Sequence, residues 1–143
     1  MPCAGPWNVI LVDSTVWIDL LRVRQTRPVT RLRRLLEIGE AAIAPVIVQE
    51  ILQGAADAPA FGKLAERFTA LPMLGIRDAP LTLHVEAARL YARARWQGIT
   101  PRSPHDCLIA VIAITHAVPL LHDDRDFEHL AEVEPKLKLV PRD

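Results

Sequence analysis

The stretch that decides the fold is VILVDSTVWIDLL, residues 9–21. Its first four residues form an apolar run that stops at Asp13, which is typical of a short, buried parallel strand. Ser14 or Thr15 can cap a helix that starts directly afterwards, because apolar residues then recur at helical spacing along one side. The stretch therefore predicts a strand that turns straight into a helix, with a carboxylate at the turn.

The same alternation of short apolar runs and helical patterns continues along the chain. We expect further strands at residues 41–44, 74–76, 119–121 and 137–140, and helices at residues 30–38, 45–54, 59–71, 80–97, 103–117 and 126–133. Strands that alternate with helices predict an α/β fold. We expect one domain over residues 1–143, with a twisted parallel sheet of four to five short strands, helices on both faces, and a loose N-terminal extension over residues 1–7.

Composition narrows the class of protein. At 143 residues the chain is long enough for one domain with a real core, and its charged fraction of 24% is ordinary for a globular protein. The longest apolar run, residues 107–114, is too short to span a bilayer, and no secretion signal is visible. Two cysteines without a C-x-x-C pair fit a reducing compartment. These observations predict a cytoplasmic protein without membrane contact.

Charge gives no overall indication of a nucleic-acid partner, because 17 basic and 17 acidic residues cancel. The distribution along the chain is uneven, with acids crowded at residues 123–134. An acid-free stretch near the other end carries six arginines: Arg22, Arg24, Arg27, Arg31, Arg33 and Arg34. Solvated helix faces explain both stretches, although a binding surface is an equal alternative for the arginines.

Four carboxylates interrupt apolar contexts at the ends of expected elements. Asp13 ends the first strand, and Asp124 follows the strand at residues 119–121. Glu50 lies on the helix after the second strand, and Asp106 lies in the first turn of a very apolar helix. Ligands bind outside the carboxyl ends of the strands in an open parallel sheet. We therefore expect the four acids to meet in one crevice at this edge.

Such a group of acids suits a hard divalent cation. Carboxylates held within a few ångströms raise one another's pKa and oppose folding, and a cation removes that cost. The absence of a clustered Cys/His set favours Mg²⁺ or Mn²⁺ over zinc. A cation held in this way can activate water and neutralise charge on a phosphodiester. No nucleophile–base pair has a supporting motif, so our hypothesis is in-line attack of an activated water on a phosphodiester.

Each acid also has a purely structural interpretation. Asp13 can cap the helix that follows it, and Glu50 can be an exposed helix residue. Asp106 stands three residues after Ser103, which fits a capping box favoured by the helix dipole. Asp124 can belong to an acidic turn. These alternatives lose weight only when the four acids are considered together.

Four segments stand out when the chain is taken in order: LVDSTVWID at residues 11–19, QEILQG at 49–54, SPHDCLIA at 103–110 and LLHDDRDF at 120–127. Together they resemble the PIN-domain ribonucleases, and within them the VapC-type toxins of toxin–antitoxin operons. Each segment alone is a weak signal. The resemblance is specific because all four occur in order and at compatible spacings, between residues 9 and 140.

The resemblance implies a role for each acid. Asp13 matches the first metal-binding acid and Asp106 the third, which completes the primary Mg²⁺ site. Glu50 matches the second acid and Asp124 the fourth, and these help to hold metal, water or a second ion. All four are thus implied as catalytic residues and as metal ligands.

Two further residues match accessory positions of the family. Thr15 resembles the hydroxyl residue that often lines the site, and Asp126 matches an accessory acid. Asp123 departs from the pattern, since a neutral or basic residue commonly stands there. The RDF that follows at residues 125–127 sets the register in favour of Asp124.

The family also implies substrate and partners. Its members are Mg²⁺-dependent endoribonucleases that act as toxins, cut structured RNA such as transfer RNA or a ribosomal RNA loop, and dimerise. They are silenced by a small antitoxin whose C-terminal segment lies in a groove near the site, as an amphipathic helix does in a hydrophobic groove. The six arginines would then bind RNA phosphates or antitoxin carboxylates.

Other classes fit less well. A phospho-acceptor receiver domain also carries acids at strand ends, but it requires a pair of acids after the first strand and a lysine after a late one. An Asp-nucleophile phosphatase requires a second acid two residues after Asp13, where Thr15 stands. A complete acid set argues against a PIN fold used only for binding. A PIN-fold nuclease outside a toxin–antitoxin system is the remaining alternative.

Overall fold

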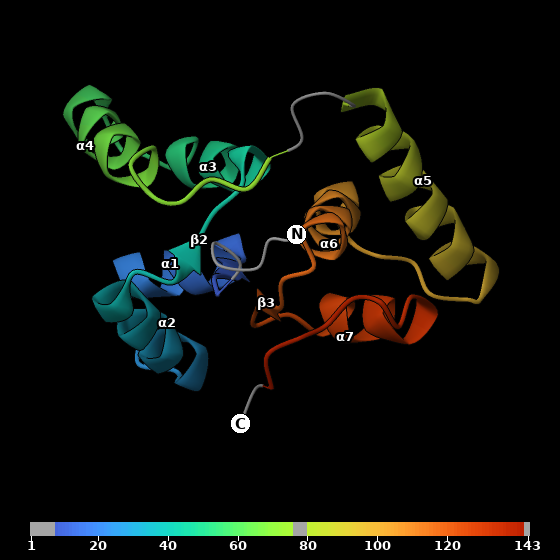
Figure 1. Ribbon diagram of the computed structural model, residues 1–143. Coiled ribbons are helices and arrows are strands. Elements are labelled where there is room, and N and C mark those ends of the chain that lie inside the picture. Colours follow the sequence, from blue (N-terminus) through green and yellow to red (C-terminus); the bar gives the residue numbers. More distant parts are fainter. Residues whose placement is uncertain (1–7, 76–79, 142–143) are drawn as a thin grey trace.

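The computed structural model describes residues 8–75 and 80–141. Its elements, drawn in Figure 1, are β1 (Ile10–Val12), α1 (Ser14–Leu21), α2 (Arg27–Ile38), β2 (Ala41–Ala42), α3 (Pro45–Leu52), α4 (Ala58–Phe68), α5 (Pro80–Trp96), α6 (Pro104–His116), β3 (Leu120–Leu121) and α7 (Arg125–Val133). The expected α/β class is confirmed. The extension expected over residues 1–7 and the strand position Ile76 lie outside the described residues.

The sheet is parallel, and β1 is its central strand in the order β2-β1-β3. Leu11 lies opposite Ala42 of β2 and Leu120 of β3. Because the strands point the same way, their carboxyl ends meet at one edge, where the N–H of Asp13 donates to the carbonyl oxygen of Leu121 at 2.9 Å. Figure 1 shows the strands at the centre, with α1 and α2 toward one side and α6 and α7 toward the other.

The sheet has fewer strands than expected. Three strands form within the described residues, where four to five were predicted. Each of the two outer segments makes only a single parallel bridge. Met73 pairs with Ile43, the residue directly after β2, and Leu139 pairs with Leu120 of β3. Pro72 stands next to the first of these segments. Pro72 accepts a hydrogen bond from the N–H of Ile43 but has no N–H to donate, so the pairing beside β2 loses a donor there.

The expected helix boundaries agree with the observed ones to within three residues. The largest difference at a helix start is in α2, which was expected from Thr30 but begins at Arg27. The Oγ1 of Thr26 accepts a hydrogen bond from the N–H of Val29 at 3.1 Å and caps the helix earlier. The helix ends at Gly39, whose φ of 73° lies in the left-handed region that glycine adopts without strain.

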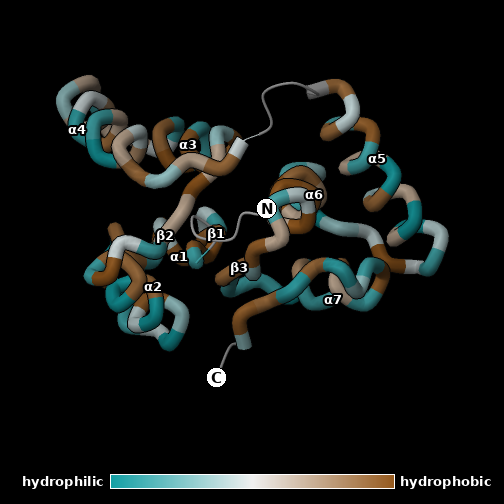
Figure 2. Tube along the Cα trace, viewed as in Figure 1, coloured by the Kyte–Doolittle hydropathy of each residue, from teal (hydrophilic) through white to brown (hydrophobic). Residues whose placement is uncertain are grey.

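Helix α6 is the most enclosed helix of the described fold. Seven of its residues are buried, from Asp106 in the first turn to Ala113, and it contacts α3, α5 and α7. Figure 2 shows α6 as mostly hydrophobic, whereas α2 and α7 alternate between hydrophilic and hydrophobic residues. A helix that is apolar nearly all round has to be covered on several sides. None of the described helices combines the length and apolarity needed to cross a membrane.

Trp17 on α1 fixes the end of β1. Its side chain is 2% exposed and packs edge to face against Phe68 of α4, with ring centroids 5.2 Å apart. Its Nε1 donates a hydrogen bond to the carbonyl oxygen of Val12 at 3.0 Å. Val12 immediately precedes Asp13, so this bond holds the backbone where the strand turns into the helix.

We expect Trp17→Phe to lower the free energy of unfolding by about 1–3 kcal/mol, because the substitution leaves the buried carbonyl of Val12 without its donor. Trp96→Phe is the matched control, since Trp96 is 74% exposed. We expect that control to change stability by less than about 0.5 kcal/mol. Urea denaturation followed by circular dichroism measures both values, and equal losses in the two variants would contradict this role of Trp17.

Candidate active site

Asp13 stands at the turn between β1 and α1 and is almost fully buried, with 2% of its surface exposed. Its Oδ2 accepts hydrogen bonds from the N–H of Thr15 at 3.1 Å and from the Thr15 hydroxyl at 2.6 Å. Asp13 is therefore the N-cap of α1, and the expectation of a cap at Ser14 or Thr15 is wrong. Its other oxygen, Oδ1, is buried without a hydrogen-bond partner.

Asp106 lies in the first turn of α6 and is buried, with 9% of its surface exposed. Ser103 caps this helix, because its Oγ accepts a hydrogen bond from the N–H of His105 at 3.2 Å. Pro104 is the first helical residue. The first turn of α6 holds the Asp106 carboxylate at the carboxyl edge of the sheet, close enough to Asp13 for the charge of Asp13 to raise its pKa.

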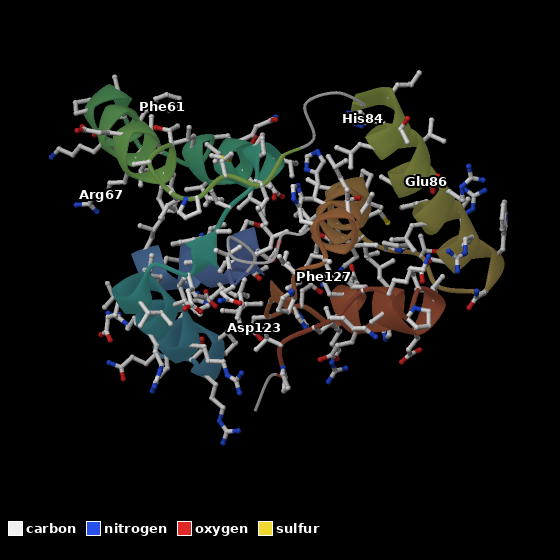
Figure 3. All side chains as sticks on the ribbon, in the orientation of Figure 1. Phe61, Arg67, His84, Glu86, Asp123 and Phe127 are labelled. Atoms are coloured by element: carbon white, nitrogen blue, oxygen red, sulfur yellow. The ribbon has the colours of Figure 1, made fainter. Side chains whose placement is uncertain are left out.

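The turn from β3 to α7 supplies the third part of the site. Asp124 caps α7, and its Oδ1 accepts a hydrogen bond from the N–H of Asp126 at 2.9 Å. The buried ring of His122 accepts a hydrogen bond at Nδ1 from the N–H of Asp124 at 3.1 Å and packs against Phe127. Figure 3 labels Phe127 and Asp123, the neighbours of this turn. The carboxylates of Asp124 and Asp126 are thus held on a rigid turn.

Glu50 lies on α3 and is half-buried. Its Oε1 is a buried atom without a hydrogen-bond partner, and its Oε2 lies 3.7 Å from Nδ1 of His105. The negative charge of Glu50 contributes to raising the pKa of both Asp13 and Asp106. Glu50 therefore belongs to the same electrostatic site, although it comes from a different helix.

Thr15 connects two of these turns. Its hydroxyl donates to Asp13 and accepts a hydrogen bond from the N–H of Asp123 at 3.3 Å. The same oxygen thus orients the buried carboxylate after β1 and holds the backbone after β3. The resemblance implied a hydroxyl at the site, and the described geometry gives that hydroxyl a positioning contact on each side.

Arg102 was not identified from the sequence. Its Nη2 donates to Oδ1 of Asp124 at 2.7 Å, and its Nε and backbone N–H both donate to Oδ2 of Asp126, at 3.2 and 3.0 Å. These hydrogen bonds and the two negative charges raise the pKa of Arg102. The only available signal was a basic residue in the proline-flanked loop before α6, which has no intrinsic link to Asp124 and Asp126, 22 and 24 residues further on.

Burial and mutual repulsion raise the pKa values of two of the acids toward neutral pH. Burial raises the pKa of Asp13 to about 6, although the hydrogen bonds from Thr15 act in the opposite direction. Burial also raises the pKa of Asp106 to about 7, with further contributions from the charges of Asp13 and Asp124. In the absence of a cation, both carboxylates therefore carry destabilising charge at pH 8.

The donor set fits a hard divalent ion. Carboxylate oxygens of Asp106, Asp124 and Asp126 lie within 4.8 Å of one another. Asp13 and Glu50 add the two buried oxygens that have no hydrogen-bond partner. Such oxygens are costly to bury unless a proton or a cation compensates them. Ions such as Mg²⁺ and Mn²⁺ prefer oxygen ligands of this kind.

A groove of about 780 Å³ opens beside the acids, between α3, α5 and α6. Its lining is mainly apolar, with basic groups at intervals, and includes Val46, His84, Tyr91, Arg95, His105 and Leu108. Figure 3 labels His84 on α5. His105 belongs to the groove and also lies next to Glu50, so the groove and the acids share the first turn of α6.

Residues 10–133 match the family model described as PIN domain. The chain belongs to the PIN-domain family. The match runs from the first residue of β1 to the last residue of α7, so it includes every turn that carries one of the acids. The family expected from the four sequence segments is therefore confirmed.

Curated relatives of this PIN domain carry VapC names. It is 36% identical over 127 residues to VapC ribonuclease Mb1587 of Mycobacterium bovis and to ribonuclease VapC11 of Mycobacterium tuberculosis, which covers 87% of this chain and 93% of each relative. It is 33% identical over 91 residues to ribonuclease VapC32 of Mycobacterium tuberculosis, across 63% of this chain and 64% of that relative. The resemblance to VapC-type PIN domains is confirmed, and these names agree with the enzyme class expected from the sequence.

A solved structure supports the fold. The PIN domain superposes with a TM-score of 0.63 on a chain described as "Toxin-antitoxin complex from Klebsiella pneumoniae", across 94% of this chain and 98% of that one. The two are 18% identical, so the comparison concerns the architecture alone.

The described structure brings the expected acids into one neighbourhood. Asp106 and Asp124 lie together with the accessory Asp126, while Asp13 and Glu50 act electrostatically on Asp106. Their roles as catalytic residues and metal ligands stay predictions. The capping role considered for Asp13 is also present, and Asp124, for which only an acidic turn was considered, caps α7 in the same way.

We expect the metal-free protein to lose stability as the pH rises from about 4 to about 7. The pKa values of Asp13 and Asp106 in the folded chain lie above the ordinary value of 3.8, so the folded chain binds more protons than the unfolded chain in this window. The free energy of unfolding then falls with rising pH. Thermal melts in EDTA at a series of pH values measure this slope.

Asp106→Asn should flatten this dependence of stability on pH and raise the midpoint temperature of unfolding in EDTA at pH 8. Each kcal/mol of unfolding free energy corresponds to roughly 4 °C in a domain of this size. Glu66→Gln, which removes an exposed carboxylate on α4, is the matched control and should leave the slope unchanged. Added Mg²⁺ or Mn²⁺ should stabilise the unmodified protein more at pH 8 than at pH 5. A slope insensitive to Asp106→Asn would reject this account.

Proposed function

We propose that this PIN domain is a Mg²⁺- or Mn²⁺-dependent endoribonuclease and the toxin of a toxin–antitoxin pair. The observation that carries the proposal is the convergence of carboxylates from three turns and α3, with buried oxygens of Asp13 and Glu50 that lack hydrogen-bond partners. Relatives named VapC ribonuclease support the activity, and a toxin–antitoxin complex of the same fold supports the partner. The proposed domain spans residues 1–143.

Asp13 and Asp106 are the proposed primary metal ligands, because both are buried and their pKa values rise when no cation is present. Glu50 and Asp124 are proposed to hold the attacking water or further positive charge. A divalent ion bound there would supply an activated water and offset charge on the phosphodiester. The chain's own contribution is to exclude bulk water around Asp13 and to hold each carboxylate at a fixed position.

Thr15 and Asp126 are proposed as accessory residues. The hydroxyl of Thr15 keeps Oδ2 of Asp13 engaged at 2.6 Å, which leaves Oδ1 as the atom available to a ligand. Asp126 adds a further carboxylate to the group around Asp106. Fixed carboxylates are favourable in catalysis because no energy is spent on reorganising them during the reaction.

Structured RNA, such as transfer RNA or a ribosomal RNA loop, is the proposed substrate. Five of the six arginines at residues 22–34 are exposed, and the other, Arg31, is half-buried. An array of cations on one stretch can neutralise RNA phosphates without reading the base sequence. Whether these arginines bind RNA or the antitoxin stays a prediction. The homodimer and the cytoplasmic location are also predictions.

The proposed antitoxin occupies the groove between α3, α5 and α6 with an amphipathic segment. The apolar lining, with Val46 and Leu108 on opposite helices, would take the apolar face of the segment. Arg95 and His84 would face its carboxylates. Because His105 lies in the groove and next to Glu50, an occupant there would sit directly beside the acids.

Asp106→Asn and Asp124→Asn should each reduce RNA cleavage at least about 100-fold, because even residues that only support a metal site contribute 10–100-fold. Asp123→Asn is the matched control for the register and should retain activity. The measurement is cleavage of transfer and ribosomal RNA by protein purified without antitoxin, with the new RNA ends sequenced. Full activity in Asp124→Asn, or an equal loss in Asp123→Asn, would reject the assigned set.

Ala88→Glu should separate antitoxin binding from RNA cleavage. Ala88 lines the groove and does not belong to the group of acids. We expect this variant to cleave RNA normally and to escape inhibition by the antitoxin, with at least about tenfold weaker binding from the buried charge. Thr82→Glu, an exposed position of α5 outside the groove, is the matched control. Unchanged antitoxin affinity in Ala88→Glu would place the antitoxin elsewhere.

A further inference from the structure

The acid site has two sides that differ in how their charge is compensated. On one side, the guanidinium of Arg102 contacts both Asp124 and Asp126, through separate nitrogens. On the other side, Oδ1 of Asp13 and Oε1 of Glu50 are buried and have no hydrogen-bond partner. Asp106 is linked to both sides: its carboxylate lies within 4.8 Å of those of Asp124 and Asp126, and the charges of Asp13 and Glu50 help to raise its pKa.

Arg102 is held in place by more than its side chain. Its backbone N–H donates to Oδ2 of Asp126 at 3.0 Å, the same oxygen that accepts from its Nε at 3.2 Å. The side chain of Asp126 is 13% exposed and that of Asp124 is 18% exposed, so the guanidinium closes a partly buried pair of acids. A planar fork that spans two carboxylates is a geometry that arginine forms and that a point charge does not.

The position of this cation has a consequence for a metal ion. A guanidinium that bridges Asp124 and Asp126 compensates charge where a second ion of a two-metal site would otherwise bind. The positive charge also repels a divalent ion at the same oxygens. At about 4 Å, even in a water-like dielectric, that repulsion corresponds to at least about a tenfold loss of affinity.

We propose that Arg102 is a built-in cation that takes the place of a second metal ion, so that the site binds a single divalent ion on the Asp13 and Glu50 side. This inference rests on the proposed metal-dependent function and refines it. Arg102 is a positioning residue here: in the folded chain its exposed guanidinium compensates Asp124 and Asp126, and the exchangeable ion has to satisfy only the carboxylates that Arg102 does not reach.

The test is the number of Mn²⁺ ions bound by each chain, measured by equilibrium dialysis and by electron paramagnetic resonance of free Mn²⁺. The unmodified protein should bind one ion. Arg102→Gln should bind two, with affinity for the second ion increased at least about tenfold. Arg102→Lys retains the charge without the fork, so it should bind the second ion more weakly than Arg102→Gln does.

Arg89→Gln is the matched control. Arg89 is also an exposed arginine, and its Nε lies 3.3 Å from a carboxylate oxygen of Glu86, but that pair is on α5. Its removal should leave the number of bound ions at one. Circular dichroism of each variant verifies that a change in stoichiometry is not caused by unfolding.

The outcomes separate this inference from the function on which it rests. Two ions bound by the unmodified protein, or one ion bound by both the unmodified protein and Arg102→Gln, would overturn the role of Arg102 and leave the metal-dependent nuclease intact. A single ion that merely binds more tightly in Arg102→Gln would also overturn it. No Mn²⁺ bound by the unmodified protein would refute the proposed function itself.

Discussion

Repulsion between buried carboxylates at the carboxyl edge of the sheet is the interaction on which the rest of this structure depends. β1 is the central strand, so the residue that follows it is enclosed by its neighbours, and Asp13 is 2% exposed. Asp106 reaches the same place from the start of α6. Burial raises the pKa of both groups. The fold thus maintains an arrangement that is unfavourable without positive charge and favourable with it.

Local structure helps to hold this arrangement, because two of the acids also begin a helix. Asp13 and Asp124 each cap a helix, and the hydrogen bonds of those caps fix one oxygen of each carboxylate. An acid at a helix start is stabilised by the helix dipole, which offsets part of the repulsion. The structural and the functional interpretation of such a residue are therefore not exclusive, because the cap is what holds the second oxygen in position.

The first turn of α6 joins the acids to the neighbouring groove. Asp106 belongs to the group of acids, and the residue before it, His105, lines the groove. The same turn follows the loop in which Arg102 contacts Asp124 and Asp126. The part of the groove that His105 lines is consequently next to Glu50. This proximity follows from the packing of α3 and α5 against α6.

Much of the fold could be predicted from local patterns. Periodicity and the punctuation by proline, glycine and capping residues located the helices, because these signals act within one turn of the chain. The strands were predicted at the correct places but in too large a number. Hydrogen-bond pairing depends on a partner strand, and Pro72 has no N–H with which to continue the pairing beside β2.

The sequence by itself determined the family, the order of the elements and the acids that the family carries, since all of these are encoded in short segments. Only the tertiary structure decided how charge is distributed among those acids. The contact of Arg102 with residues more than twenty positions away, the unpaired oxygen of Glu50 and the burial of His122 arise from packing between distant segments. Such contacts have no local signature, because their free energy depends on burial and separation in space rather than on neighbours in the chain.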